Sequence, residues 1–180
     1  MMKKRIEISI IILVVIIMFQ GCATLKKETD KSFVWKSEQW NYSFVVPDHW
    51  KLADKNDPSI KTENCDVYLE GTVEASIAIF AYSGLHKSYT ASEIMDEIIE
   101  KYRSVYTDFR IIAIDTIKNG DLTALVVKFE GQGQTIKITE IYAVIFSESV
   151  DLLISANCPT KVLASNEEDI MNLIRSIKIG

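Results

Sequence analysis

The chain contains little of the material from which metal centres and nucleophile sites are built. Its 180 residues include two histidines and three cysteines, and no C-x-x-C or H-x-x-x-H spacing occurs. Zinc sites depend on such residues at such spacings. The G-x-S-x-G motif of serine hydrolases and the glycine pattern of dinucleotide-binding folds are also missing from the sequence. We therefore expect no catalytic residues, no metal and no cofactor, and we predict that the chain is not an enzyme.

Basic residues are few relative to acidic ones. Twenty Lys and Arg stand against 25 Asp and Glu, which gives a formal net charge of −5. Removal of residues 1–21 would take away three basic residues and one acidic residue and would change the net charge to −7. The phosphate backbone of nucleic acids selects clustered Lys and Arg. The sequence therefore predicts that the chain does not bind nucleic acid.

One long hydrophobic run stands out, and it lies close to the N-terminus. It extends over residues 10–19 and follows a basic segment at residues 3–5. A helix that spans a bilayer needs about 20 predominantly apolar residues, whereas the hydrophobic part of a signal peptide needs about 7–15. The short run therefore predicts an export signal at residues 1–21. The alternative is a signal anchor that is not cleaved.

The hydrophobic run leads into Gly21 and Cys22, and this junction resembles the lipobox of bacterial lipoproteins. The resemblance implies that signal cleavage falls between Gly21 and Cys22, and that Cys22 is the lipidation site. Residues 22–32 would then be the lipidated N-terminus and a polar tether. Ala23 after the cysteine, by resemblance to known sorting rules, favours the outer membrane. We expect a protein of the cell envelope, lipid-anchored to a membrane and facing the periplasm or the exterior.

The other two cysteines are Cys65 and Cys158. Outside the cytoplasm they can form a disulfide, which would close a long loop and stabilise the fold. The alternative is two separate buried thiols that pack as small hydrophobic side chains. Whether their Cα atoms lie close enough for a bond cannot be derived from the spacing.

Residues 33–180 read as one α+β domain, a length that suits a single globular unit. Eight strands are expected at 33–36, 42–46, 66–70, 75–82, 109–117, 122–130, 135–146 and 150–156. Strands grouped between helices, instead of alternating with them, indicate an antiparallel sheet with helices packed on it. Asn119 and Gly120 predict a tight type I′ hairpin turn between the fifth and sixth strands.

Two helices are predicted from capping boxes, Thr90 with Glu93 and Ser165 with Glu168. Each helix has an apolar stripe at helical spacing, so both are expected to pack on the sheet. The stripes comprise Ile94, Met95, Ile98, Ile99, Tyr102 and Val105 in the first helix, and Ile170, Leu173, Ile174 and Ile177 in the second. The acidic residues 167–169 are interpreted as charges that compensate the helix dipole, with a cation-binding edge as the alternative.

The segment from Trp40 to Trp50 is an aromatic strand that ends in Pro47 and a short turn before the second tryptophan. It resembles the opening of PsbP-like domains, the family of the extrinsic PsbP subunit of photosystem II and of relatives of DcrB. The order of the later elements follows that family over residues 33–180. The resemblance implies an α/β/α sandwich with a twisted antiparallel sheet flanked by helices. Members of the family generally act as binding or stabilising subunits.

The three tryptophans, Trp35, Trp40 and Trp50, are candidates for an interface, because amphipathic aromatic side chains are enriched at protein interfaces. Alternatively, Trp40 and Trp50 seal one end of the sheet. His49 is expected in a turn without a functional role, and His86 is expected in a solvated loop.

The sequence therefore favours a membrane-anchored, extracytoplasmic lipoprotein that acts as a non-enzymatic binding or stabilising module. Its expected partners are the membrane, through the lipid anchor, and an envelope protein. The alternative is a periplasmic small-ligand carrier or weak hydrolase that uses a pocket between sheet and helix, and a pocket of roughly 300 Å³ or more would favour it.

Overall fold

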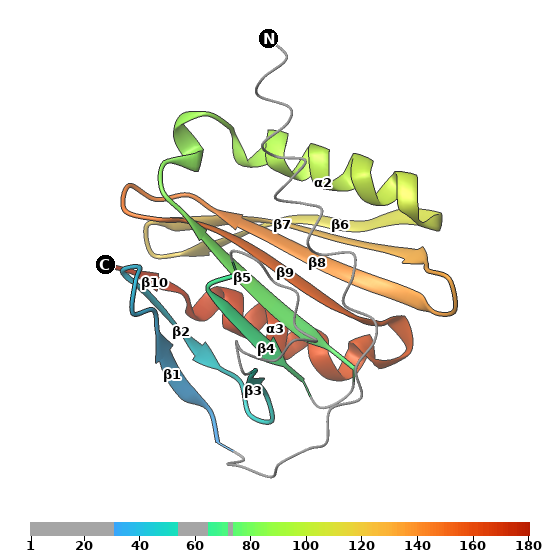
Figure 1. Ribbon diagram of the computed structural model, residues 1–180, viewed down its shortest axis with the longest axis horizontal. Coiled ribbons are helices and arrows are strands. Elements are labelled where there is room, and N and C mark those ends of the chain that lie inside the picture. Colours follow the sequence, from blue (N-terminus) through green and yellow to red (C-terminus); the bar gives the residue numbers. More distant parts are fainter. Residues whose placement is uncertain (1–30, 54–64, 72–73) are drawn as a thin grey trace.

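The structure is a computed structural model that describes residues 31–53, 65–71 and 74–180. These residues form two antiparallel sheets and two α-helices (Figure 1). The larger sheet has seven strands in the order β3-β4-β5-β9-β8-β7-β6, and the smaller sheet has the order β1-β2-β10. The strands are β1 (Phe33–Lys36), β2 (Tyr42–Val46), β3 (Lys51–Leu52), β4 (Val67–Glu70), β5 (Ser76–Tyr82), β6 (Thr107–Asn119), β7 (Leu122–Gln132), β8 (Lys137–Ile145), β9 (Asp151–Pro159) and β10 (Lys178–Ile179).

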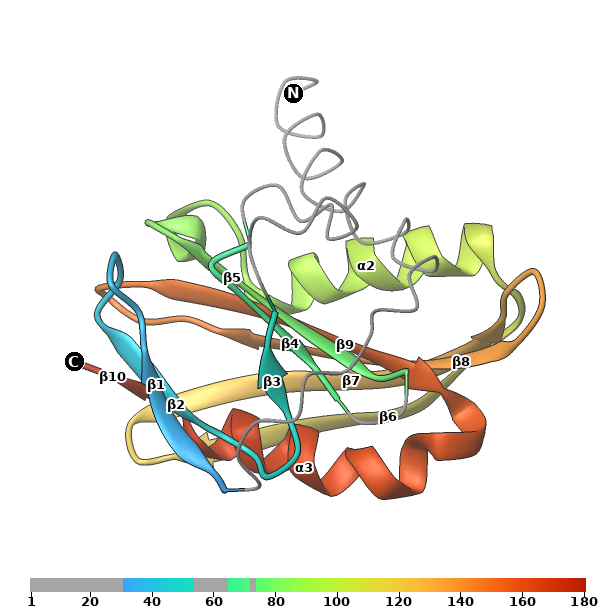
Figure 2. The same cartoon turned by 60° about the horizontal axis from the view of Figure 1, so that its bottom comes forward.

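The two helices lie on opposite sides of the larger sheet. In Figures 1 and 2, α2 (Ala91–Val105) lies above strands β6 to β8 and α3 (Leu163–Ser176) lies below them. One apolar cluster fills the space under α2, and a second fills the space between the sheet, α3 and β2. The antiparallel pairing and the flanking helices confirm the predicted α+β class and its α/β/α layering.

The helix α2 begins as its sequence predicts. Thr90 Oγ1 accepts a hydrogen bond from the Glu93 amide, and a carboxylate oxygen of Glu93 accepts one from the Thr90 amide. These two bonds are the capping box, in which the side chains satisfy backbone groups that the helix leaves unpaired. The predicted apolar stripe is buried from Ile94 to Tyr102, but Val105 is exposed because it stands at the helix end.

The predicted capping box at the start of α3 is wrong. The helix begins at Leu163, two residues before Ser165, and follows a 3-10 turn at Thr160–Val162. The Ser165 hydroxyl donates to the Val162 carbonyl inside the helix and caps no amide. The S-x-x-E pattern is present, but the turn after β9 already starts the helical winding upstream of it. The apolar stripe of this helix is buried as predicted.

The hairpin between β6 and β7 also differs from its prediction. Asn119 pairs directly with Leu122, so the two-residue loop is Gly120 and Asp121. Gly120 has φ 59°, whereas Asn119 and Asp121 keep negative φ. A type I′ turn needs positive φ at both central residues, so this turn is of another type. Gly120 supplies its positive φ without a steric cost.

No helix among residues 31–53, 65–71 and 74–180 is long and apolar enough to cross a membrane. The predicted leader, with the cleavage position Gly21, lies outside the described residues, and so does the predicted tether from the lipidation site Cys22 to residue 30.

Candidate functional site

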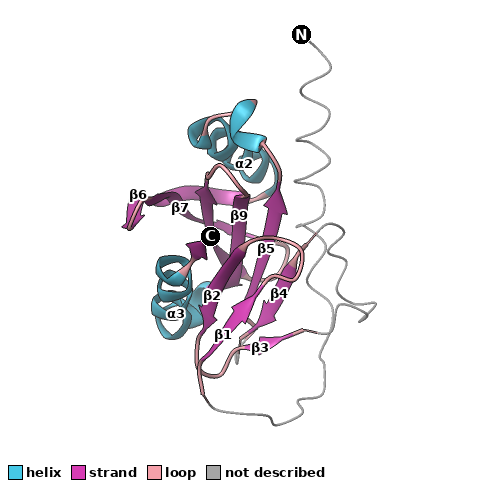
Figure 3. Ribbon diagram, turned by 90° about the vertical axis from the view of Figure 1, so that its left-hand side faces the viewer, coloured by secondary structure: helices cyan, strands magenta, loops and turns pink. Residues whose placement is uncertain are grey.

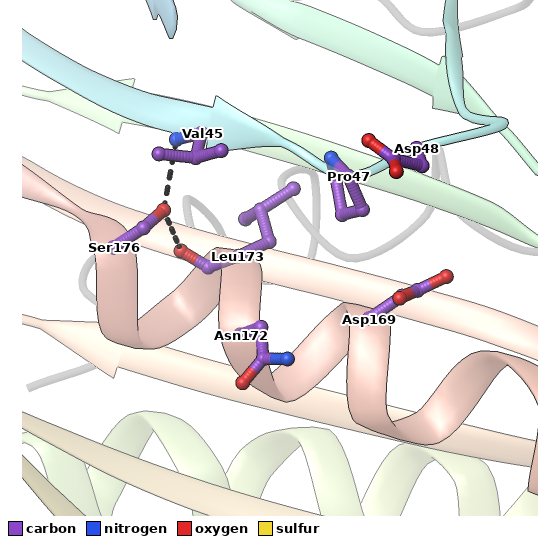
Figure 4. Close-up of a pocket in the computed structure, with 7 residues that line it drawn as sticks. All are labelled: Val45, Pro47, Asp48, Asp169, Asn172, Leu173 and Ser176. Carbon is purple, nitrogen blue, oxygen red and sulfur yellow. Dashed lines mark hydrogen bonds between the residues drawn. The ribbon is translucent and has the colours of Figure 1, made fainter. Parts of the chain in front are cut away.

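A groove lies between the second half of β2 and the C-terminal half of α3 (Figure 4). The last strand, β10, pairs with β2 only at Tyr42 and Ser43, which leaves the rest of this edge of β2 next to α3. The Val45 amide donates a hydrogen bond to Ser176 Oγ (2.8 Å), and the Ser176 hydroxyl donates to the Leu173 carbonyl (2.7 Å). These bonds tie the strand to the helix at one end of a groove of about 380 Å³.

The lining of this groove combines apolar side chains with negative charge. The lining residues are Val45, Pro47, Asp48, Asp169, Asn172, Leu173 and Ser176. Figure 4 shows Asp48 and Asp169 at the end away from Ser176, one on the turn after β2 and one on α3. Because these lining residues include two carboxylates and no cationic side chain, the groove suits a ligand with an apolar part and a positive charge.

Of the three candidate tryptophans, Trp50 belongs to the interior. It is 4% exposed, and its indole nitrogen donates to Asp169 Oδ2 (3.2 Å), which fixes one of the groove carboxylates. Trp35 and Trp40 are half-buried and pack against the same core. The interface interpretation is therefore wrong for Trp50, and the alternative that it seals the sheet fits the structure. Its place in the site is indirect, through Asp169.

The structure does not join Cys65 and Cys158 by a disulfide. Cys158 lies in β9 within the cluster on the α3 side, whereas Cys65 packs against the cluster on the α2 side. The sheet itself separates the two side chains, and a disulfide needs Cα atoms within about 7 Å. The structure has two separate thiols, as the alternative expects, but only Cys158 is buried and Cys65 is half-buried. Burial raises the pKa of the Cys158 thiol to about 11.

His86 is held by a carboxylate, and the prediction of a solvated histidine is wrong. Its ring nitrogen Nδ1 lies 2.9 Å from Asp151 Oδ1, and its amide donates to Asp151 Oδ2 (3.0 Å). Asp151 is fully buried and also accepts a hydrogen bond from the Ser147 amide (3.3 Å). A carboxylate that accepts from Nδ1 fixes the proton on that nitrogen. The pair fastens the segment before α2 to β9. His49 is exposed in the turn after β2, as expected.

A buried carboxyl group under α2 has no counterpart in the sequence predictions. Glu140 is 2% exposed, and the Tyr106 hydroxyl donates to its Oε1 (2.9 Å). Beside it the hydroxyls of Tyr102 and Tyr142 lie 2.6 Å apart. Burial raises the pKa of Glu140 to about 8, although the bond from Tyr106 acts in the opposite direction. The sequence contains one indication that Glu140 is buried. It stands two residues before Tyr142 in β8, and alternate residues of a strand point to the same face of the sheet.

By sequence, neither a protein-family model nor a curated protein matches the chain. Solved structures do match it. Cyanobacterial PsbP (CyanoP) from Synechocystis superposes with a TM-score of 0.63 at 9% identity, over 90% of this chain and 99% of that one. LpqN from Mycobacterium tuberculosis, described as involved in cell envelope biogenesis, gives 0.58 at 10% identity, over 83% and 90% of the two chains. The Ran-binding protein Mog1p from Saccharomyces cerevisiae gives 0.57 at 15% identity, over 84% and 96%.

These likenesses define a class of fold. The chain has the PsbP-like fold, a sheet-rich α+β arrangement with two helices, as its sequence pattern predicts. Identities of this size support the fold alone. A shared fold does not fix a function, which has to be argued from the site.

Proposed function

We propose that this protein is a non-enzymatic protein-binding module, held at a membrane by a lipid on Cys22, whose groove between β2 and α3 takes a segment of an envelope protein. The observation that carries the proposal is the groove itself, with its volume of about 380 Å³, its apolar floor and its two carboxylates at one end. The matching partner segment has an apolar side chain next to a lysine or arginine, because apolar contact supplies affinity and opposite charge supplies orientation.

The walls of the groove are already in place without a partner. Phe44 and Val46 on β2 and Leu173 on α3 are buried in one apolar cluster. The bond from Val45 to Ser176 joins the two walls at the surface. A site that needs no rearrangement avoids the free-energy cost of ordering its side chains on binding. This supports recognition of a short segment by a preformed surface.

Two of the solved structures that match this fold are compatible with such a role. One is named as a Ran-binding protein, and another is described as involved in cell envelope biogenesis. Neither name carries a partner over to this chain. They support the general class of binding module, and the groove supplies the particular surface.

The proposed anchor would place the groove close to the membrane. The tether of residues 22–32 could span at most about 40 Å when fully extended. Intact mass of the membrane fraction tests this part, since cleavage before Cys22 with lipid attached gives a defined mass. A mature chain that retains residues 1–21 without lipid would contradict the anchor and leave the groove proposal standing.

The groove is tested with the full-length chain as bait in detergent-solubilised envelope. Asn172→Arg places a bulky cation in the groove, and Asp48→Arg reverses one of its charges. We expect both variants to lose a protein that the unchanged chain retains, by tenfold or more. Asp121→Arg, at the exposed turn between β6 and β7, is the matched control and should retain it. Equal capture by all four baits would contradict the groove as the binding surface.

A second candidate function is carriage of a small cationic ligand, because the groove exceeds the roughly 300 Å³ typical of ligand pockets. Hydrolysis is not supported there. The Ser176 hydroxyl donates to a backbone carbonyl, and the lining residues include no histidine to act as its base. Spermidine is a suitable probe: a rise in melting temperature that Asp48→Arg abolishes would favour the carrier, and no shift at millimolar spermidine would argue against it.

A further inference from the structure

Among residues 31–53, 65–71 and 74–180, the strand β6 is an edge of the larger sheet and pairs only with β7. It has 13 residues, whereas the strand at the opposite edge, β3, has two. Figure 3 shows β6 at the rim of the sheet, far from β1 to β4. Long edge strands are templates for pairing with another chain, and proteins commonly protect them with charge or proline. This one has no proline, and between Arg110 and Asp115 it exposes three isoleucines, Ile111 (39%), Ile112 (41%) and Ile114 (58%).

A bulge at Ile112 places two of these isoleucines on the same face. Ile111 pairs with Phe129 and Ile114 pairs with Val127, and the register shifts between them. Phe129 and Val127 both belong to the cluster under α2. Ile111 and Ile114 therefore share the α2 face of the sheet, although they stand three residues apart.

The charged residues that flank the isoleucines lie on the other face. Arg110 pairs with Glu130, and Asp115 pairs with Val126, which belongs to the cluster on the α3 side. Arg110 forms an ion pair with Glu130, and 63% of its side chain remains exposed. The edge thus carries a cation at one end of the isoleucine segment and an anion at the other, both on the α3 face.

We propose that β6 pairs with the β6 strand of a second copy of this chain, antiparallel, about a two-fold axis between Ile112 and Ala113. This register sets Ile111 of each copy opposite Ile114 of the other. The two residues lie on the same face of the sheet, as directly opposed residues in an antiparallel pair must. The two seven-stranded sheets become one continuous sheet, and the exposed isoleucines of both copies are covered together.

The charges fit the same register. Arg110 of each copy falls opposite Asp115 of the other, again on one face, so the axis generates two cross-strand ion pairs. No two like charges fall opposite each other along the paired segments. An interface built on a two-fold axis requires this self-complementarity, because the same patch meets itself.

Other registers lose these matches. A shift by one residue sets Arg110 opposite Ile114, or Ile111 opposite Asp115, and in each case the two residues belong to different faces. A shift by two residues restores the faces of the residues outside the bulge but removes both ion pairs. In one direction it also brings Asp108 opposite Asp115, a like-charge pair. Among these alignments of two copies, the edge therefore favours the one centred between Ile112 and Ala113.

Charge reversal gives a test that a general loss of folding cannot imitate. The full-length chain is prepared in detergent with either of two affinity tags. We expect the unchanged chains to co-purify, and we expect Arg110→Asp alone and Asp115→Arg alone each to reduce co-purification at least tenfold, because each puts like charges together twice. A mixture of the two variants should restore it, since both cross-strand pairs are then opposite in sign.

Ile114→Asp should abolish the association, and Val34→Asp on β1, at 60% exposure, is the matched control that should leave it unchanged. Circular dichroism verifies that each variant is folded. Unchanged chains that stay monomeric would overturn the proposal, as would co-purification that survives Ile114→Asp, or a mixture that fails to recover. The groove and the β6 edge share no residue, so this proposal and the proposed function fail separately.

Discussion

The strand β9 is buried along its whole length, yet the side chains that it contributes to the two faces of the seven-stranded sheet differ in chemistry. On the α3 side, β9 contributes Leu152, Ile154, Ala156 and Cys158 to a cluster of apolar side chains. On the α2 side, the same strand contributes Asp151, Leu153, Ser155 and Asn157, and all of these are buried. The neighbouring strand β8 adds Glu140 and Tyr142 to this polar interior.

This difference determines how each face is stabilised. Apolar burial gains free energy in proportion to area and does not depend on pH. A buried polar group stabilises the fold only while its hydrogen bonds and its protonation state are right. The α3 face should therefore respond mainly to changes of side-chain volume. The α2 face should respond to changes of hydrogen bonding and of pH.

The largest expected effect is on the apolar face. Ile154→Ala removes a fully buried side chain from β9 and leaves a cavity, so we expect the free energy of unfolding to fall by about 4 kcal/mol. Urea denaturation measures it, and the fall should be the same at pH 6 and pH 8. Val34→Ala, at an exposed position of β1, should change stability by no more than about 0.5 kcal/mol. A loss below 1 kcal/mol at Ile154 would show that this face is not the tight apolar interior described.

The next effect is the pH dependence of the α2 face. The pKa of Glu140 is raised to about 8 in the folded chain, whereas an unfolded glutamate titrates near 4.3. Between these values the native state holds a proton that the unfolded state has lost. Stability from this group is therefore fully present below the unfolded pKa and is lost as pH rises toward 8. From pH 6 to pH 8 the loss is at most about 3 kcal/mol.

Glu140→Gln isolates this contribution. Glutamine keeps an oxygen that accepts from the Tyr106 hydroxyl and carries no titrating proton. Its free energy of unfolding should fall less between pH 6 and pH 8 than that of the unchanged chain. Glu148→Gln, at an exposed site between β8 and β9, should follow the unchanged chain. Parallel pH curves for all three proteins would mean that Glu140 titrates normally.

A smaller loss is expected where the α2 face holds His86. The Asp151 carboxylate accepts hydrogen bonds from the His86 ring, the His86 amide and the Ser147 amide. Asp151→Asn keeps the size of the side chain but replaces one accepting oxygen by an NH₂ group, which then faces donors and cannot accept from them. We expect a loss of about 2 kcal/mol, measured by urea denaturation at pH 7. Asp121→Asn at an exposed turn is the control. If the two variants were equally stable, the contacts around Asp151 would contribute nothing measurable.

The same contrast separates what the sequence can and cannot predict. Alternation and capping residues are local signals, and they located β1 and β2 at their observed bounds and α2 at its capping box. The polar interior depends on pairs distant in sequence, such as His86 with Asp151. No spacing rule relates such residues, so the sequence predicts a solvated His86 from its polar loop alone.

The groove could not be predicted from the sequence either, because its residues are distant from one another along the chain. Asp48 lies in the turn after β2 near the start of the domain, and Asp169 lies on the last helix, where the sequence predicts a charge that compensates the helix dipole. Only the packing of α3 against β2 brings them to one surface. The volume and the charge of this groove depend on the tertiary structure. The sequence shows which residues are present but not that they lie at one surface.

The smallest expected effects compare the starts of the two helices, one on each face. Thr90→Ala removes a side chain that accepts from the Glu93 amide, so α2 should lose about 1 kcal/mol of stability. Ser165→Ala removes a hydroxyl that donates to the Val162 carbonyl, accepts from the Asn166 side chain and caps no backbone amide of α3, and we expect a change within about 0.5 kcal/mol. Both helices have the sequence pattern of a capping box. Thermal unfolding of the two variants therefore tests whether the observed hydrogen bonds or the sequence pattern determine how much the Thr90 and Ser165 side chains stabilise the protein. Equal losses would indicate that Ser165 caps α3 after all and that this helix begins where its sequence pattern places it.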